Sequence, residues 1–208
     1  MNGLKKIFFY LFPFIVLYLT IWLHELGHSV MAFALSCKTN WWQTDVSWYL
    51  WDSWGGEIDY NCLEQKGSLA LAAVDGTGIL VNIIFLILIL KFGLRKISVH
   101  LNSKKQLFFL FLFWWALANY AEAFSYLVLN TIWLKSDMAT VVTATGINRF
   151  FWLAAGILLA VFFIRKIIIL IHKASEIYYF SSKQMAILVC AYITVVGGLM
   201  GLARIILT

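Results

Sequence analysis

Residues 7–35, IFFYLFPFIVLYLTIWLHELGHSVMAFAL, form an apolar run that a single polar group interrupts. A helix needs about 20 apolar residues to cross the hydrocarbon core of a bilayer, so this run is long enough to span it. The polar group, His24-Glu25-Leu26-Gly27-His28, is an HExxH motif. Ionisable side chains within a membrane span are costly unless they have partners, and they mark a functional site by default. We therefore expect a retained membrane helix that carries chemistry.

The composition of the whole chain also indicates an integral membrane protein. Of its 208 residues, 62% are hydrophobic and 12% are charged, whereas soluble domains average about 45–50% apolar and about 25% charged residues. This composition excludes a soluble enzyme, a disordered chain and a coiled coil. We predict one domain over residues 1–208, an all-α polytopic membrane protein built as a bundle of about five transmembrane helices. Beyond the first, the predicted spans are about 69–90, 107–130, 148–164 (continued by 167–171, with a possible earlier start near Asp137) and 185–206.

The segments between the predicted spans differ in charge. Residues 91–105 carry five basic residues and no acid, whereas residues 37–68 carry five acids against two bases. Because basic segments stay in the cytoplasm, we expect a multi-pass protein with its N-terminus in the cytoplasm. The basic residues of the chain, whose net charge is +6, lie mainly in segments between the spans and not along one stripe, so the expected partner is the lipid bilayer and not a nucleic acid.

Residues 37–68 are also rich in tryptophan and tyrosine, which gather at membrane interfaces. We expect an extramembrane segment that rests on lipid headgroups, or a membrane-dipping hairpin with its turn at Gly55-Gly56. Cys37 and Cys62 both lie in this segment and are expected to pair if that side of the membrane is oxidising.

The HExxH spacing is typical of a metal site. His24 and His28 are four residues apart on one helix face, so both imidazoles can reach one metal ion, and Glu25 can polarise a water molecule and carry its proton. A catalytic zinc site needs a third protein ligand, and the candidates are Asp75, Glu122 and Asp137. Their depths in the membrane leave the choice open. The alternative without a metal is a pair of packing histidines beside a buried glutamate.

With these residues the chain resembles the site-2 protease family of intramembrane zinc metalloproteases, in its divergent, minimal branch. Gly78-Ile79-Leu80-Val81-Asn82 is similar to the family's Gly-Pro-x-x-Asn element, with isoleucine in place of proline. Ser136-Asp137-Met138 resembles the Ser-Asp-Ala element of the minimal branch. The resemblance covers about residues 15–165. It implies that His24, His28 and Asp137 hold Zn²⁺, and that Glu25 is the catalytic base.

The resemblance implies an enzyme that hydrolyses a peptide bond in a transmembrane or membrane-anchored protein substrate. Asp75 precedes the Gly-x-x-x-Asn element, which is the wrong order for the family, and Glu122 is then expected to orient a histidine N–H. Asn82 and Asn119 are expected to join helices by hydrogen bonds or to contact substrate. Family members commonly have the HExxH helix ending toward the cytoplasm, whereas the charges here place that end outside.

Two alternatives stay open. One is an HExxH membrane protease of the heat-shock or prenyl-protein-processing type, with Glu122 as the third ligand. The other is a catalytically inactive membrane scaffold that binds a metal.

Overall fold

The computed structural model describes residues 3–46, 53–93, 103–178 and 181–195 as a mainly helical bundle. Four of its helices are long and apolar enough to cross a membrane. They are α1 (Gly3–Ala34), α3 (Ser68–Leu88), α4 (Ser103–Phe124) and α7 (Arg149–Tyr178). These helices correspond to the first four predicted spans. The fifth predicted span is described only as far as α8 (Ser182–Ile193) and the turn after it, and its remainder lies outside the described residues.

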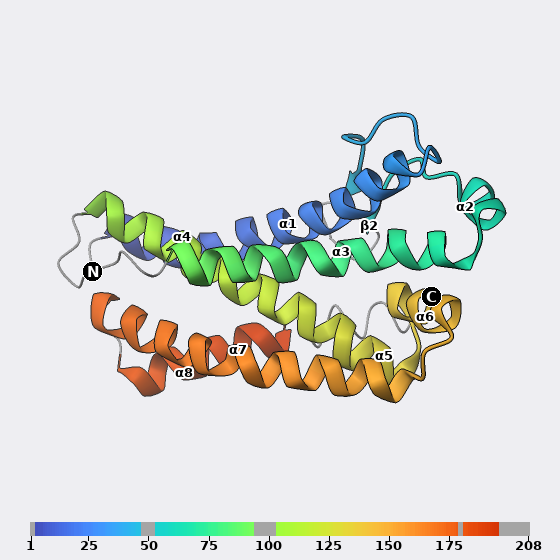
Figure 1. Cartoon of the computed structure of the whole chain (residues 1–208). Coiled ribbons are helices and arrows are strands. Elements are labelled where there is room, and N and C mark those ends of the chain that lie inside the picture. Colours follow the sequence, from blue (N-terminus) through green and yellow to red (C-terminus); the bar gives the residue numbers. More distant parts are fainter. Residues whose placement is uncertain (1–2, 47–52, 94–102, 179–180, 196–208) are drawn as a thin grey trace.

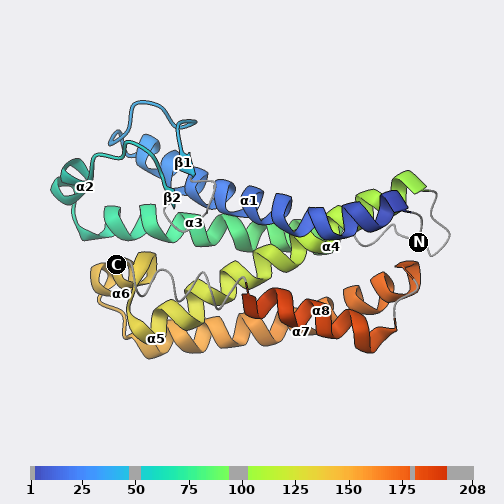
Figure 2. The same ribbon diagram turned by 180° about the vertical axis from the view of Figure 1, so that it is seen from behind.

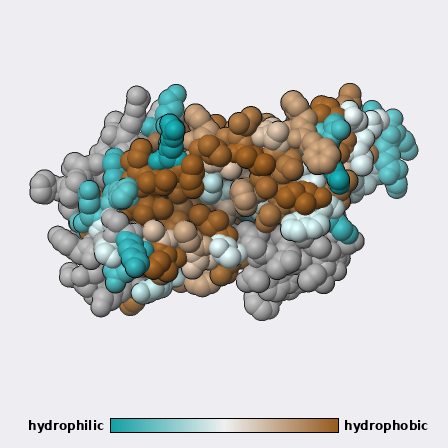
Figure 3. All heavy atoms as spheres, turned by 90° about the horizontal axis from the view of Figure 1, so that it is seen from below, coloured by the Kyte–Doolittle hydropathy of each residue, from teal (hydrophilic) through white to brown (hydrophobic). Residues whose placement is uncertain are grey.

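The bundle has two layers joined by α4. In Figures 1 and 2, α1 and α3 lie side by side on one side, α7 and α8 lie on the other, and α4 crosses diagonally between them. The apolar window of α4 is 72% buried, against 22% to 33% in the other three long helices. Those three helices therefore leave broad apolar faces for lipid. Seen from below, hydrophobic side chains cover the middle of the molecule and hydrophilic ones gather toward its ends (Figure 3).

Several helix boundaries differ from the sequence prediction. The α4 helix continues without a break into π-helical η2 (Ser125–Asn130) and the short α5 (Thr131–Trp133), and α3 continues into π-helical η1 (Ile89–Gly93). The fourth span does not begin near Asp137, because Ser136–Thr145 forms a separate short helix, α6. Gly146 ends α6 in the left-handed conformation (φ 66°), which a glycine adopts at little cost.

The segment between α1 and α3 packs against the end of α1. It contains a two-stranded antiparallel sheet, β1 (Asp45–Val46) and β2 (Ser53–Trp54), and the helix α2 (Tyr60–Lys66). The predicted hairpin is present, but its turn is not at Gly55-Gly56. These glycines follow β2, and the connection between the strands falls within residues 47–52, outside the described part of the chain.

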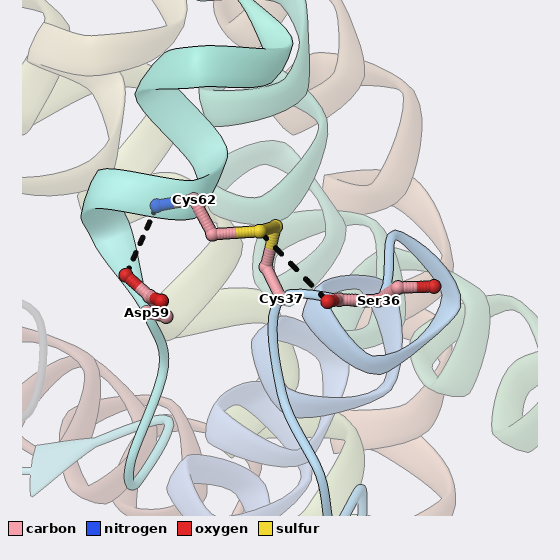
Figure 4. The surroundings of a disulfide bond; sticks show 4 residues. All are labelled: Ser36, Cys37, Asp59 and Cys62. Atoms are coloured by element: carbon pink, nitrogen blue, oxygen red, sulfur yellow. Dashed lines mark hydrogen bonds between the residues drawn. A yellow bond between two sulfur atoms is a disulfide. The ribbon is translucent and has the colours of Figure 1, made fainter.

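A disulfide joins the two ends of this segment, as predicted. Cys37, just beyond α1, is bonded to Cys62 in the first turn of α2 (Figure 4). Asp59 caps α2 by accepting a hydrogen bond from the backbone N–H of Cys62 at 3.0 Å, and its own N–H donates to the Cys37 carbonyl at 3.0 Å. The disulfide and these bonds hold α2 and the hairpin to the end of α1.

Candidate metal centre

The HExxH motif lies in the second half of α1 and is buried. His24, Glu25 and His28 are 2%, 6% and 6% exposed. The two imidazoles lie one helical turn apart, with ring centroids separated by 4.7 Å. Ring nitrogens of both histidines and a carboxylate oxygen of Glu25 all lie within 4.8 Å of one another. These three residues form a group able to hold a metal ion.

Hydrogen bonds from α3 orient both imidazoles. Nδ1 of His28 lies 2.8 Å from the Val74 carbonyl oxygen, to which it donates, so Nε2 keeps its lone pair. Nδ1 of His24 lies 3.1 Å from Nδ2 of the buried Asn82 side chain. Oδ1 of Asn82 has no partner among the described residues, and turning the amide by 180° lets it accept the Nδ1 proton. With this arrangement, both histidines present a bare Nε2 to the same point, as metal ligands do.

The carboxylate of Asp137 meets both imidazoles at that point. Its Oδ2 lies 2.9 Å from Nε2 of His24 and 3.3 Å from Nε2 of His28. The aspartate is in the first turn of α6, which packs against α3. Two nitrogens from α1 and one carboxylate oxygen from α6 therefore converge, which is a donor set that suits zinc.

The other two candidate acids lie elsewhere. Asp75 is in the body of α3, where Thr140 hydrogen bonds to its carboxyl group. Glu122 is buried in α4, and its charge acts on His24 and on Tyr192. The histidine N–H groups that Glu122 was expected to orient face Val74 and Asn82 instead. Asn82 thus serves the site directly, whereas Asn119 donates to the Trp115 carbonyl of its own helix at 2.8 Å and to the Thr20 hydroxyl of α1 at 3.4 Å.

Gly78 leaves open the space that the imidazoles fill. A Cβ atom at this position would lie 2.6 Å from Nε2 of His28 and 2.7 Å from Nε2 of His24, closer than any real contact. Gly27 of the motif faces it, since a Cβ there would lie 3.1 Å from Cα of Gly78. The two glycines let α1 and α3 approach closely enough for the histidines to reach across α3 toward Asp137. The sequence marked Gly78 only as part of a loose Gly-x-x-x-Asn element.

We expect Gly78→Ala to weaken zinc binding at least about 10-fold, since errors in histidine orientation cost about 10–100-fold in metal affinity. The matched control is Gly76→Ala on the same helix, where the new Cβ would meet only Cγ2 of Val141, at an ordinary 3.8 Å. The measurement is competition for zinc against a chromophoric chelator in detergent. Equal affinities for the two variants would show that the gap at Gly78 is not needed.

The end of β2 is held against the motif. A Cβ atom on Gly55 would lie 3.1 Å from Cβ of His28 and 3.6 Å from the Glu25 carbonyl oxygen. The buried Lys38 ammonium donates to the Gly55 carbonyl oxygen. Burial lowers the pKa of Lys38, and the charge of Glu57 opposes this shift. The lysine next to the disulfide therefore fixes the extended backbone of the hairpin beside Glu25 and His28.

The sequence analysis missed two contributors to the site. One is the Val74 carbonyl, because backbone groups leave no trace in the side-chain pattern. The other is Tyr126 of η2, whose ring stacks on His24 with centroids 4.5 Å apart. A tyrosine in an apolar run is typical of a buried core residue, so nothing in the sequence indicated that Tyr126 belongs to the site.

Comparison of the chain with family models, with curated proteins and with solved structures finds no match. The arguments for a function therefore rest on the chemistry of the site and on its place in an apolar helical bundle.

Proposed function

We propose that this protein is an intramembrane zinc metalloprotease. The observation that carries the proposal is the contact of the Asp137 carboxylate with Nε2 of both motif histidines, at 2.9 and 3.3 Å, inside a bundle of membrane-length apolar helices. A buried histidine pair alone could be packing. A carboxylate brought to both free ring nitrogens is a ligand set with one place left for water or substrate.

His24, His28 and Asp137 would hold the zinc ion. The fit is supported by the two hydrogen-bonded Nδ1 positions and by the open space beside Gly78. When bound there, zinc supplies Lewis-acid chemistry, which lowers the pKa of a water molecule and polarises a carbonyl group.

Glu25 would act as general base. It neighbours His24 in the chain, and its carboxylate lies within 4.8 Å of ring nitrogens of both histidines. From that place it can take a proton from the attacking water and deliver it to the leaving amine. Burial at 6% exposure keeps bulk water from competing for this proton.

The proposed substrate is a transmembrane or membrane-anchored protein. Such a segment must unwind locally before cleavage, because its own helical hydrogen bonds shield the scissile carbonyl. An apolar cavity of about 480 Å³ between α3, α6 and α7, bordered by Met138 next to the proposed ligand Asp137, supports an apolar substrate. The resemblance of the motifs to site-2 proteases favours the same class.

The direct test is cleavage of a labelled single-span protein with helix-breaking residues, co-reconstituted with the purified protein in liposomes. We expect products whose ends map to the half of the span at the depth of the motif. A zinc chelator should abolish them, and added zinc should restore them. A protein that binds zinc but cleaves neither this substrate nor an unfolded polypeptide in detergent would support the inactive scaffold.

We further propose that the metal centre lies toward the outer side of the membrane. The disulfide, α2 and α6 lie at one end of the bundle, and the starts of α1 and α4 lie at the other (Figure 1). Disulfides persist in oxidising compartments, and the basic segments belong to the opposite end.

Impermeant thiol labelling of intact cells tests this orientation. In a Cys190→Ala background, Ile147→Cys at the metal end should react from outside, and Lys104→Cys should react only after lysis. Labelling of Lys104→Cys from outside would reverse the topology and restore the orientation usual in the family.

A further inference from the structure

Besides α1, α3 and α6, the π-helical turn η2 near the end of a long buried helix also contributes to the site. The chain runs from α4 (Ser103–Phe124) through η2 (Ser125–Asn130) into α5 without leaving the helical path. A π turn holds more residues per turn than an α-helix, so it changes the direction in which the next side chains point, and such turns occur often at functional sites. Its cost in backbone geometry calls for a compensating contact.

Tyr126, the second residue of η2, makes that contact with His24. The two rings are stacked, with an interplanar angle of 14° and centroids 4.5 Å apart, and the tyrosine is 2% exposed. The imidazole is thereby held at three places. Asn82 faces its Nδ1 edge, Asp137 faces its Nε2 edge, and Tyr126 covers one of its faces.

The stacking contact with Tyr126 restricts a motion of the His24 ring that its two edge contacts leave free. Hydrogen bonds at the edges set where the two nitrogens lie, but they allow the ring to tilt about the line that joins them. A flat partner against the face removes this tilt. Tyr126 also belongs to a buried cluster with Met138, the residue after Asp137, so the same side chain supports the helix that brings the carboxylate.

We propose that Tyr126 is a positioning residue for the metal centre, and that the π turn η2, directly after α4, sets its ring against His24. The inference rests on the proposed zinc site and does not depend on proteolysis. Replacing the ring by a side chain without a flat face should let His24 tilt, and poorly oriented ligands lose about 10–100-fold in metal affinity.

The test compares Tyr126→Leu with Tyr126→Phe. We expect Tyr126→Leu to bind zinc at least about 10-fold more weakly than the natural chain and Tyr126→Phe to keep its affinity, because phenylalanine retains the stacked ring. The matched control is Tyr120→Leu, which removes another buried tyrosine from α4, one whose hydroxyl donates to the Ala160 carbonyl at 3.3 Å. This control should lose thermal stability and keep its zinc affinity.

The readouts are zinc affinity by chelator competition and the visible spectrum of the cobalt-substituted protein, which reports ligand geometry. The spectrum should shift in Tyr126→Leu and not in Tyr126→Phe or Tyr120→Leu. If Tyr126→Leu does not fold, Tyr126→Met replaces it, since methionine fills much of the volume and has no flat face.

Three results would overturn the proposal. Natural affinity in both Tyr126→Leu and Tyr126→Met would show that the ring does not position His24. Loss of affinity in Tyr126→Phe would assign the role to the hydroxyl group. An equal loss of zinc affinity in Tyr120→Leu would show that the effect comes from the general loss of packing in α4 and not from the stacked ring. No substrate enters these measurements, so a failure of proteolysis leaves them standing, whereas a natural chain that binds no zinc would remove both the proposed function and this inference.

Discussion

Glu25→Gln is expected to abolish peptide-bond cleavage while zinc stays bound. Glutamine has nearly the same shape as glutamate but cannot serve as a base, so the change removes the proposed general base and leaves the proposed ligands His24, His28 and Asp137 in place. General-base catalysis contributes about 10²–10⁴-fold, so the residual rate should fall near the background. The measurement combines cleavage rate and metal content on the same purified sample.

The matched control is Glu64→Gln, the same change at an exposed position on α2. It should keep both activity and zinc. Cleavage that survives in Glu25→Gln would refute the assignment of the base. Loss of zinc from this variant would make Glu25 a ligand, which its distance of no more than 4.8 Å from the histidine nitrogens permits geometrically.

Asp137→Ala is expected to lose both zinc and activity. The carboxylate is the third donor at the point where both Nε2 atoms meet, so its removal leaves two histidines, and a catalytic zinc site uses three protein ligands. Glu122→Ala should keep its zinc and lose less activity than Asp137→Ala, because Glu122 acts on His24 only through its charge, and Nδ1 of each histidine faces Asn82 or Val74.

Zinc stoichiometry of the two variants, measured side by side in detergent, decides between the protease classes. Glu64→Ala, at an exposed position on α2, serves as a further control and should not affect metal content. If Glu122→Ala empties the site and Asp137→Ala does not, the ligand assignment is wrong. The heat-shock or prenyl-protease type of mechanism would then replace the site-2 type.

Much of the architecture followed from composition and from apolar run length. A run of about 20 apolar residues has few alternatives to a membrane-spanning helix, so the four long helices could be located from the sequence alone. The boundary near Asp137 was harder, since Ser136–Thr145 and Arg149–Tyr178 are both helical and only residues 146–148 separate them. The hairpin turn was misplaced because a Gly-Gly pair indicates a turn but does not specify which residues pair on either side of it.

The motif residues were predictable because HExxH encodes its own geometry within one helix turn. Depth in the membrane left the third donor open, because depth says nothing about rotation around a helix axis, and only the resemblance to site-2 proteases favoured Asp137. Asp75, Glu122 and Asp137 lie at similar depths, and only the packing of α6 against α3 brings one of them to the histidines. The roles of Val74, Gly78 and Tyr126 depend on contacts between helices, which one sequence without an alignment does not record.

The distribution of the donors along the chain has a consequence for biosynthesis. Asp137 follows His24 by 113 positions, with α3 and α4 between them. A nascent chain that has inserted only its first two long helices has both histidines and Asn82, but it lacks Asp137, the proposed third ligand. The proposed zinc site can therefore be completed only after the ribosome has passed α6. For the proposed protease, this order of residues along the chain would keep an unfinished copy from cleaving the membrane proteins being inserted beside it.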